Sequence, residues 1–303
     1  MEKILVIKLG ALGDFVQATG AFSAIRQHHA DAEITLLTTK GMMPFAKDNP
    51  NFDKIHIDTR QKLYNLSYLK RLMGMLRGYD MVYDLQTNDR TNFAYYFLAG
   101  RPAWCGIAPC CTYKQVNPLR GQMHTLDRLA DQLKVAGVEN MDAPNLLYAA
   151  KDSAEIVREY GLDLSKLILL VPGGSAHRPE KRWSYFAELS DALMAKGYQT
   201  VLVGAGAEES LLNEIEKKCA AINLCNKTSI GELIDLSSKA AFVIGNDTGP
   251  THIAVASGAK GAVLFGSASN PKRCAPRGEG VHIFHKTDID AITTQEIVGK
   301  VLG

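Results

Sequence analysis

The 303-residue sequence predicts an α/β protein with two Rossmann-like domains, each built around a parallel sheet. Short β-rich runs alternate with helical patterns in both halves of the chain, which is the signature of βαβ units. A stretch of low periodicity at 137–152 separates the two series and indicates a linker. We therefore expect domains at 1–150 and 151–303, with ligand sites at the carboxyl ends of their strands.

In the first half, apolar runs and helical spacing define the expected elements. Strands are predicted at 4–7, 34–38, 54–57, 81–84 and 104–107, and helices at 15–28, 63–76, 91–98 and 126–136.

The second half repeats the alternation. Strands are predicted at 167–171, 200–203, 241–244 and 262–265, and helices at 154–160, 184–196, 208–219, 230–239, 251–257 and 293–302.

Composition excludes several classes of protein. Thirty-four basic and 32 acidic residues give a net charge of +2, too small to indicate nucleic acid as the main partner. The chain has neither a signal-peptide pattern nor an uncharged apolar run of about 18 residues, so we expect a soluble, cytoplasmic protein. Its six cysteines form no C-x-x-C pair, which argues against a zinc site or a disulfide framework.

A glycine turn follows the first predicted strand and has the sequence Lys8-Leu9-Gly10-Ala11-Leu12-Gly13-Asp14. Such a turn lies at the carboxyl end of a parallel strand, where open α/β sheets bind ligands. Its glycines allow the backbone to turn tightly and to approach a ligand closely. Asp14 suits two roles, a cap for the following helix or a general base, and the residue pattern leaves both open.

A second glycine-containing segment follows the first strand of the second half and reads Pro172-Gly173-Gly174-Ser175-Ala176-His177-Arg178-Pro179-Glu180-Lys181-Arg182-Trp183. Its glycines permit close backbone approach, while Lys181 and Arg182 supply positive charge at a strand end. This combination suits a diphosphate. The alternative is a surface loop with an ordinary basic rim.

A third segment, Gly245-Asn246-Asp247-Thr248-Gly249-Pro250-Thr251-His252, also follows an apolar strand and opens a short helix. Free backbone N–H groups at a helix start can receive phosphate oxygens. Asp247 or Thr248 can bind hydroxyl groups at the same place. His252 suits this site or the role of a packed core histidine.

Three other patterns are less specific. Residues 204–209 resemble half of a dinucleotide fingerprint, but Glu209 replaces its third glycine, which argues against an NAD site. Asp288-Ile289-Asp290 precedes the last helix and is interpreted as a helix N-terminal acid cluster rather than a metal-binding D-x-D. Basic residues at 62–77 lie among apolar ones at helical spacing. They indicate a solvated helix face or a contact with anionic lipid or a phosphorylated glycan at a membrane surface.

Taken together, the three glycine-containing segments resemble those of the bacterial heptosyltransferases, glycosyltransferase family 9. The third segment, with Ile253-Ala254-Val255-Ala256 after it, is the most specific. The segments occur in the family's order, and the similarity runs through nearly the whole chain. It implies the GT-B fold, in which two Rossmann-like domains face each other across the active-site cleft.

The resemblance also implies a reaction. A sugar is transferred from a nucleotide-diphosphate donor, typically ADP-L-glycero-D-manno-heptose, to the inner core of lipopolysaccharide, with inversion and without a metal or other cofactor. Asp14 is similar to the family's catalytic base, and Lys181 to its donor-phosphate lysine. The residues expected to bind the donor are Gly13, Ser175, Lys181, Asp247, Thr248, Gly249 and His252, and those expected to bind the acceptor are Lys62, Lys70, Arg71 and Arg90.

The partners implied are a nucleotide-sugar donor and a lipid A-linked or other anionic glycan acceptor, with peripheral contact at the cytoplasmic face of the inner membrane. Two other functions stay open. A sugar-nucleotide epimerase of the GT-B fold would need no acceptor. A non-catalytic nucleotide-sugar or glycan-binding protein would bind without turnover, and the joint presence of Asp14, Lys181 and Asp247 argues against it.

Overall fold

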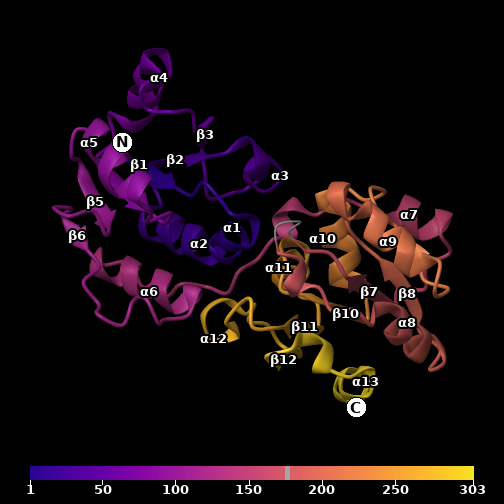
Figure 1. Cartoon of the computed structure of the whole chain (residues 1–303). Coiled ribbons are helices and arrows are strands. Elements are labelled where there is room, and N and C mark those ends of the chain that lie inside the picture. The colour runs from indigo at the N-terminus through magenta and orange to yellow at the C-terminus, as the bar shows by residue number, and fades with distance from the viewer. Residues whose placement is uncertain (175–177) are drawn as a thin grey trace. The chain divides into compact units, whose positions relative to one another are not determined.

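The computed structural model describes residues 1–174 and 178–303. The chain divides into two compact units, Met1–Pro144 and Asn145–Gly303, whereas the sequence pattern predicted the boundary at residue 150. Each unit is an α/β domain with a six-stranded sheet whose strands all pair in parallel (Figure 1). The predicted fold class of two Rossmann-like parallel-sheet domains is confirmed.

The N-terminal sheet has its most apolar strand near its middle. The side chains of residues 4–7 are completely buried there, as expected for a strand covered on both faces. In spatial order the strands are β3 (Lys54–Ile57), β2 (Glu33–Thr38), β1 (Lys3–Ile7), β4 (Met81–Asp84), β5 (Ala103–Gly106) and β6 (Tyr113–Lys114).

Helices pack on this sheet in two groups. One group contains α1, α2 and α6, which contact one another, and the other contains α4 and α5 (Figure 1). A π-helix, Arg90–Tyr95, leads directly into α5. The helices are α1 (Leu12–Gln17), α2 (Thr19–His28), α3 (Met43–Ala46), α4 (Leu66–Leu76), α5 (Tyr96–Leu98) and α6 (Thr125–Val135).

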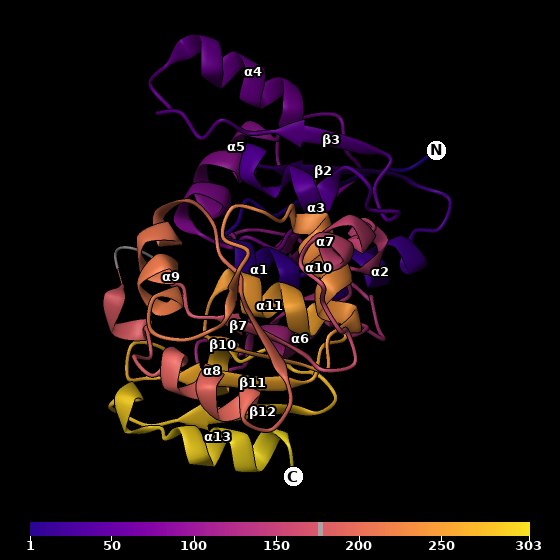
Figure 2. The same ribbon diagram turned by 90° about the vertical axis from the view of Figure 1, so that its right-hand side faces the viewer.

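The C-terminal sheet repeats the same plan (Figure 2). Its strands are, in spatial order, β12 (Val281–His285), β11 (Gly261–Phe265), β10 (Phe242–Asn246), β7 (Leu167–Val171), β8 (Gln199–Leu202) and β9 (Ile222–Asn223). Its helices are α7 (Ala154–Glu159), α8 (Phe186–Met194), α9 (Glu209–Glu216), α10 (Ile230–Lys239), α11 (Gly249–Ala256), α12 (Pro271–Cys274) and α13 (Thr294–Val301). The helix α8 contacts both α9 and α13, while α10 packs against α11.

Both sheets contain a topological switch point. In the N-terminal sheet the chain proceeds outward in opposite directions from β1 and β4, and in the C-terminal sheet it does so from β7 and β10. The loops that leave such a pair of strands diverge, and the crevice between them is where open α/β sheets bind ligands. The three glycine-containing segments leave β1, β7 and β10, so each begins at a switch point.

The prediction of a single helix at 15–28 was wrong. The helix α1 starts earlier, at Leu12, and Ala18 separates it from α2. Gly20 in α2 lies directly against the backbone of Asp142, and a Cβ at this position would overlap the Asp142 carbonyl oxygen. This packing depends on a segment more than a hundred residues away, which a local hydrophobic pattern does not contain.

Other differences have local causes. The helix expected from residue 63 begins at Leu66 because the Asn65 side chain caps it, accepting a hydrogen bond from the Tyr68 N–H at 3.1 Å. The expected strands did not include β6, β9 or β12. The strands β6 and β9 have two residues each, and all three sit at a sheet edge. A run of two residues has no measurable period.

Candidate active site

The C-terminal switch point holds an ion pair between a partly buried lysine and a buried aspartate. Lys181 is the last residue of a 3₁₀-helix, Pro179–Lys181, in the loop after β7, and Asp247 directly follows β10. Lys181 Nζ lies 2.7 Å from Asp247 Oδ2, and the two side chains are 16% and 7% exposed. The fold therefore brings together two residues that are 66 positions apart in the sequence and that were expected to bind one donor.

The surroundings of Asp247 keep its carboxylate charged. Burial by itself raises the pKa of Asp247, but hydrogen bonds from His252, Lys181 and Ser269 outweigh burial and lower it well below its usual range. His252 Nε2 lies 3.2 Å from Asp247 Oδ1. His252 is thus both a buried residue and a direct contact of the site.

Asn246 connects the two loops of this site through hydrogen bonds. Its Nδ2 donates to the carbonyl oxygens of Pro172 and Gly173 at 2.8 and 3.2 Å, which joins the end of β10 to the loop after β7. Its Oδ1 accepts a hydrogen bond from the Trp183 N–H, and its own carbonyl oxygen accepts one from Thr251 Oγ1. The loops that carry Lys181 and Asp247 are therefore held together by one buried amide.

The helix α11 begins beside the ion pair. Thr248 is its N-cap residue and Gly249 its first residue, and the Thr248 side chain makes no capping hydrogen bond. Pro250, the second residue of the helix, has no N–H, so the first turn offers an anion the N–H groups of Gly249 and Thr251, which have no partner within the helix. Ser175, the remaining donor residue expected in this unit, lies outside the described residues.

Glu208 is a further polar residue at this edge that the sequence prediction did not include. It follows β8, and its carboxylate lies where a Cβ on Gly173 would stand, so a larger residue at 173 would require the Glu208 side chain to move. Its carboxylate oxygens are acceptors suited to hydroxyl groups. The sequence did indicate a ligand-binding segment here, since Glu208 lies in the segment 204–209 that resembles half of a dinucleotide fingerprint.

Asp14 belongs to the N-terminal switch point. It is exposed and lies in the first turn of α1, whose N-cap residue is Ala11. The interpretation of Asp14 as an N-cap was therefore wrong. Gly13 lies in the same turn of α1. The residue whose backbone requires glycine is Gly10, because its φ of +124° is rarely adopted by residues with a side chain.

The four basic residues expected at the acceptor differ in their contacts. Lys62, Lys70 and Arg71 are exposed on or just before α4. Arg90 instead donates to the hydroxyls of Tyr68 and Tyr95 and to the Gln61 carbonyl oxygen. Both tyrosine hydroxyls donate in turn to the buried Asp58 carboxylate. These bonds hold the loop before α4 to the π-helix, and the acceptor role of Arg90 stays a prediction.

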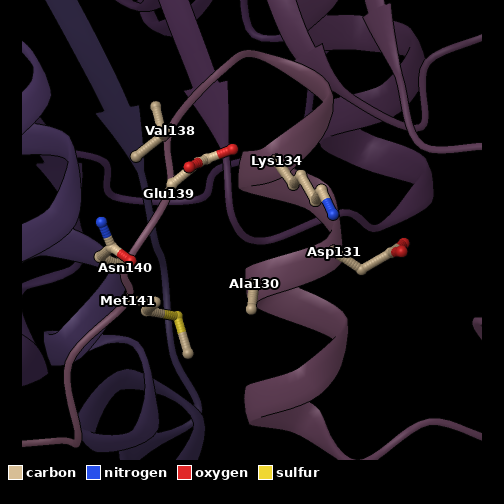
Figure 3. A pocket seen from close by; sticks show the side chains of 7 residues that line it. All are labelled: Ala130, Asp131, Lys134, Val138, Glu139, Asn140 and Met141. Carbon is tan, nitrogen blue, oxygen red and sulfur yellow. The ribbon is translucent and has the colours of Figure 1, made fainter.

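A separate pocket of about 340 Å³ lies in the N-terminal unit (Figure 3). Asp131 and Lys134 project from α6, and the segment that runs beside the helix supplies the other walls, so charges of both signs line the space. The pocket contains none of the expected site residues. Its lining residues are Ala130, Asp131, Lys134, Val138, Glu139, Asn140 and Met141.

Residues 1–174 and 178–303 contain neither a candidate metal site nor a candidate membrane span. No group of three or more His, Cys, Asp or Glu side chains is arranged to hold a metal ion. None of the helices in these ranges has the length and apolar character needed to cross a bilayer.

The two doubly wound sheets carry an ion-paired lysine and a helix start at one switch point and a carboxylate at the other, which makes the strand ends the candidate ligand sites of this α/β protein. Comparison with known proteins identifies it further. The model of "Glycosyltransferase family 9 (heptosyltransferase)" matches residues 122–298. The chain belongs to this family and is a glycosyltransferase, as the resemblance of its motifs predicted.

The chain is also similar to individual proteins that are named as heptosyltransferases. Lipooligosaccharide heptosyltransferase 2 of Haemophilus influenzae is 24% identical over 292 residues, covering 88% of this chain and 84% of the relative. Lipopolysaccharide heptosyltransferase 3 of Escherichia coli is 25% identical over 281 residues, covering 85% and 80%. Among solved structures, a family 9 glycosyltransferase from Veillonella parvula superposes with a TM-score of 0.86 at 21% identity, covering 99% of this chain and 96% of that one.

Proposed function

We propose that this chain transfers a heptose from ADP-heptose to a lipopolysaccharide core or a related anionic glycan, with inversion and without a metal. The observation that carries the proposal is the Lys181–Asp247–His252 cluster beside the start of α11. A partly buried cation and the N–H groups at a helix start suit a diphosphate, and a buried carboxylate suits sugar hydroxyls. The relatives' names supply the sugar and the acceptor.

The chemistry follows from these residue types. Asp14 removes the proton from an acceptor hydroxyl as its oxygen attacks the anomeric carbon of the donor. The bond from that carbon to the diphosphate oxygen breaks, and ADP leaves with the bonding electrons. Because negative charge grows on the diphosphate, Lys181 and the N–H groups near Thr248 and Gly249 stabilise the transition state more than the ground state.

The other donor contacts in the proposal are Gly13, Ser175, Asp247 and His252. In this proposal, residues 1–150 bind the acceptor and 151–303 bind the donor. The N-terminal part supplies the base, whereas the C-terminal part supplies the positive charge that the diphosphate needs.

A screen of nucleotide sugars by thermal shift tests the donor. A ligand that binds only the native state stabilises it by RT ln(1 + [L]/Kd), which is about 2.7 kcal/mol at a hundredfold excess over Kd. We expect ADP-heptose and ADP to raise the melting temperature and UDP-hexoses to leave it unchanged. A shift with UDP-hexoses alone would refute the donor, and a new sugar formed without any acceptor would indicate an epimerase.

We further propose that the protein works at the cytoplasmic face of a membrane, through a surface that we call the α4 surface: Lys62, Tyr64, Leu66, Lys70 and Arg71. Tyr64 and Leu66 are 77% and 78% exposed. No acidic residue occurs from 59 to 79, so the apolar side chains are flanked by positive charge alone. Exposed apolar residues beside basic ones suit an anionic bilayer surface.

Vesicle flotation tests this surface. We expect the protein to bind phosphatidylcholine vesicles that contain phosphatidylglycerol and not vesicles of phosphatidylcholine alone. The double variant Tyr64→Ser/Leu66→Ser should bind at least about a hundredfold more weakly, because each buried side chain contributes about 1.5–3 kcal/mol and about 1.4 kcal/mol corresponds to a factor of ten. Leu147→Ser, at an exposed leucine of the C-terminal unit, serves as the matched control. Equal binding of the two variants would reject the α4 surface.

A further inference from the structure

The residue before the glycine turn that leads to Asp14 is held on both of its backbone polar groups by side chains. The Leu9 N–H donates to Gln86 Oε1 at 2.8 Å, and the Leu9 carbonyl oxygen accepts from Thr39 Oγ1 at 3.1 Å. Thr39 directly follows β2, and Gln86 lies in the loop after β4, so the two side chains come from the strands on either side of β1. The start of the turn is therefore fixed from both sides.

Leu9 lies one step beyond the regular ladder between β1 and β4. The two strands place Ile7 opposite Asp84, and their last backbone bond runs from the Leu85 N–H to the Ile7 carbonyl oxygen at 3.1 Å. A continued parallel ladder would join the Leu9 N–H to the Leu85 carbonyl oxygen. That carbonyl oxygen accepts instead from Lys8 Nζ at 3.1 Å. A buried N–H without a partner is costly, so Leu9 takes its acceptor from a side chain of the loop after β4.

Asp84 shapes the loop that supplies this acceptor. Its side chain is completely buried, and Oδ1 accepts from the N–H groups of Gln86 and Thr87, each at 3.0 Å. An aspartate that binds the N–H two residues further on forms an Asx turn, which bends the chain. Thr87 has a φ of +45°, which residues with a side chain rarely adopt. This turn sets the place from which the Gln86 side chain reaches Leu9.

The position of Asp14 depends on Leu9 because the chain between them is short. Gly10 and Ala11 alone separate Leu9 from α1, whose first turn contains Asp14. The N-cap of α1 makes no side-chain hydrogen bond, so no cap fixes this first turn. The buried side chains of α1 begin at Phe15 and hold the helix beyond Asp14. The bonds to Leu9 hold the chain before it.

We propose that Gln86 is a positioning residue for Asp14: its amide oxygen fixes the Leu9 peptide and thereby the place at which Asp14 meets the acceptor hydroxyl. This inference rests on the proposed function, in which Asp14 is the base. A general base must lie within hydrogen-bond reach of its proton, and a displacement of about 1 Å can lower a rate about a hundredfold. Loss of the bond to Leu9 therefore slows the transfer step and leaves substrate binding intact.

Steady-state kinetics of Gln86→Met tests the inference. Methionine has a similar length, but its thioether is a weak acceptor, so the Leu9 N–H loses its partner. We expect kcat to fall about tenfold to a hundredfold, while KM for ADP-heptose and for the acceptor changes less than about twofold. Gln86→Glu keeps an acceptor oxygen and should recover most of kcat. Thr39→Val removes the other bond to Leu9 with little change of shape, and it should lower kcat in the same direction.

Gln199→Met is the matched control. Gln199 Oε1 also accepts a backbone N–H, that of Asp163, at 2.6 Å, and the residue is partly exposed like Gln86. It is the first residue of β8, so it lies at the opposite end of its strand from the ligand-binding edge. Gln199→Met loses the same kind of bond and should transfer at the wild-type rate.

The double variant Gln86→Met/Asp14→Asn shows whether Gln86 acts through Asp14. Two residues that work through one group have non-additive effects. In the Asp14→Asn background there is no base left to misplace, so Gln86→Met should lower the residual rate less than about twofold. An additional loss as large as in the wild-type background would overturn the inference.

Other outcomes also decide the question. A wild-type kcat in Gln86→Met overturns the inference, and should that variant fail to fold, a wild-type kcat in Thr39→Val overturns it instead. A raised KM for the acceptor with unchanged kcat would also overturn it, because Gln86 would then be a substrate contact. Wild-type protein that transfers no heptose overturns the proposed function, and the inference with it. An active wild type with an unaffected variant overturns the inference alone, so the two failures are distinguishable.

Discussion

Asp14→Asn should lower the rate of heptose transfer about a hundredfold to ten-thousandfold, because a positioned general base contributes a factor of this size. The amide keeps the shape of the carboxylate but cannot accept the acceptor's proton. Asp14 is exposed and makes no capping hydrogen bond in α1, so the change should leave the fold intact. Transfer from ADP-heptose, followed by mass spectrometry of the glycan, measures the rate.

The control for this variant is Asp48→Asn, at an acid of the same unit whose side chain is 50% exposed and lies 3.7 Å from Lys47. It should transfer at the wild-type rate. The thermal shift produced by ADP should be the same in both variants and in wild type. Near-normal turnover by Asp14→Asn would remove Asp14 from the reaction and would require a base elsewhere.

Lys181→Met should cause the second large loss of transfer activity, through weaker stabilisation of the donor's leaving diphosphate. Loss of one group that stabilises developing charge lowers kcat about a hundredfold to a thousandfold. The variant should also unfold more easily, because Asp247 keeps a buried charge without its lysine, and breaking such a pair costs about 3–5 kcal/mol. Lys217→Met, at an exposed lysine of the same unit, should change neither property.

The stability loss of Lys181→Met should depend on pH in a defined direction. In the wild-type protein the pKa of Asp247 is lowered, so its ionised form stabilises the folded state above about pH 4, and this contribution fades as the pH falls further. Without Lys181 the folded pKa rises, and protonation relieves the unpaired charge. The difference in melting temperature between variant and wild type should therefore shrink from pH 7 to pH 3. A constant difference would show that packing, not charge, causes the loss.

Several features of the site could be predicted because they depend on short stretches of sequence. Each glycine-containing segment follows an apolar run, and the carboxyl end of a parallel strand is where such a segment must lie. Lys181 and Asp247 were therefore expected at a strand edge before their 2.7 Å contact was known. The family was predicted from the same segments and is confirmed.

Other features had no local signal. Arg90 was expected at the acceptor together with Lys62, Lys70 and Arg71, but its partners Tyr68 and Tyr95 come from different elements, and the local pattern does not contain them. The contact of Arg120 with Thr87 likewise joins the loop after β6 to the loop after β4, which are distant in the sequence.

The sequence by itself determined the two βαβ series, the positions of the three segments after their strands, and the family, because each depends on residues close together in the chain. The tertiary structure decided which charges meet. It paired Lys181 with Asp247, and it joined Arg90 to the hydroxyls of Tyr68 and Tyr95. Contacts of this kind depend on strand order and on packing between distant segments. A single sequence does not predict which strands become neighbours.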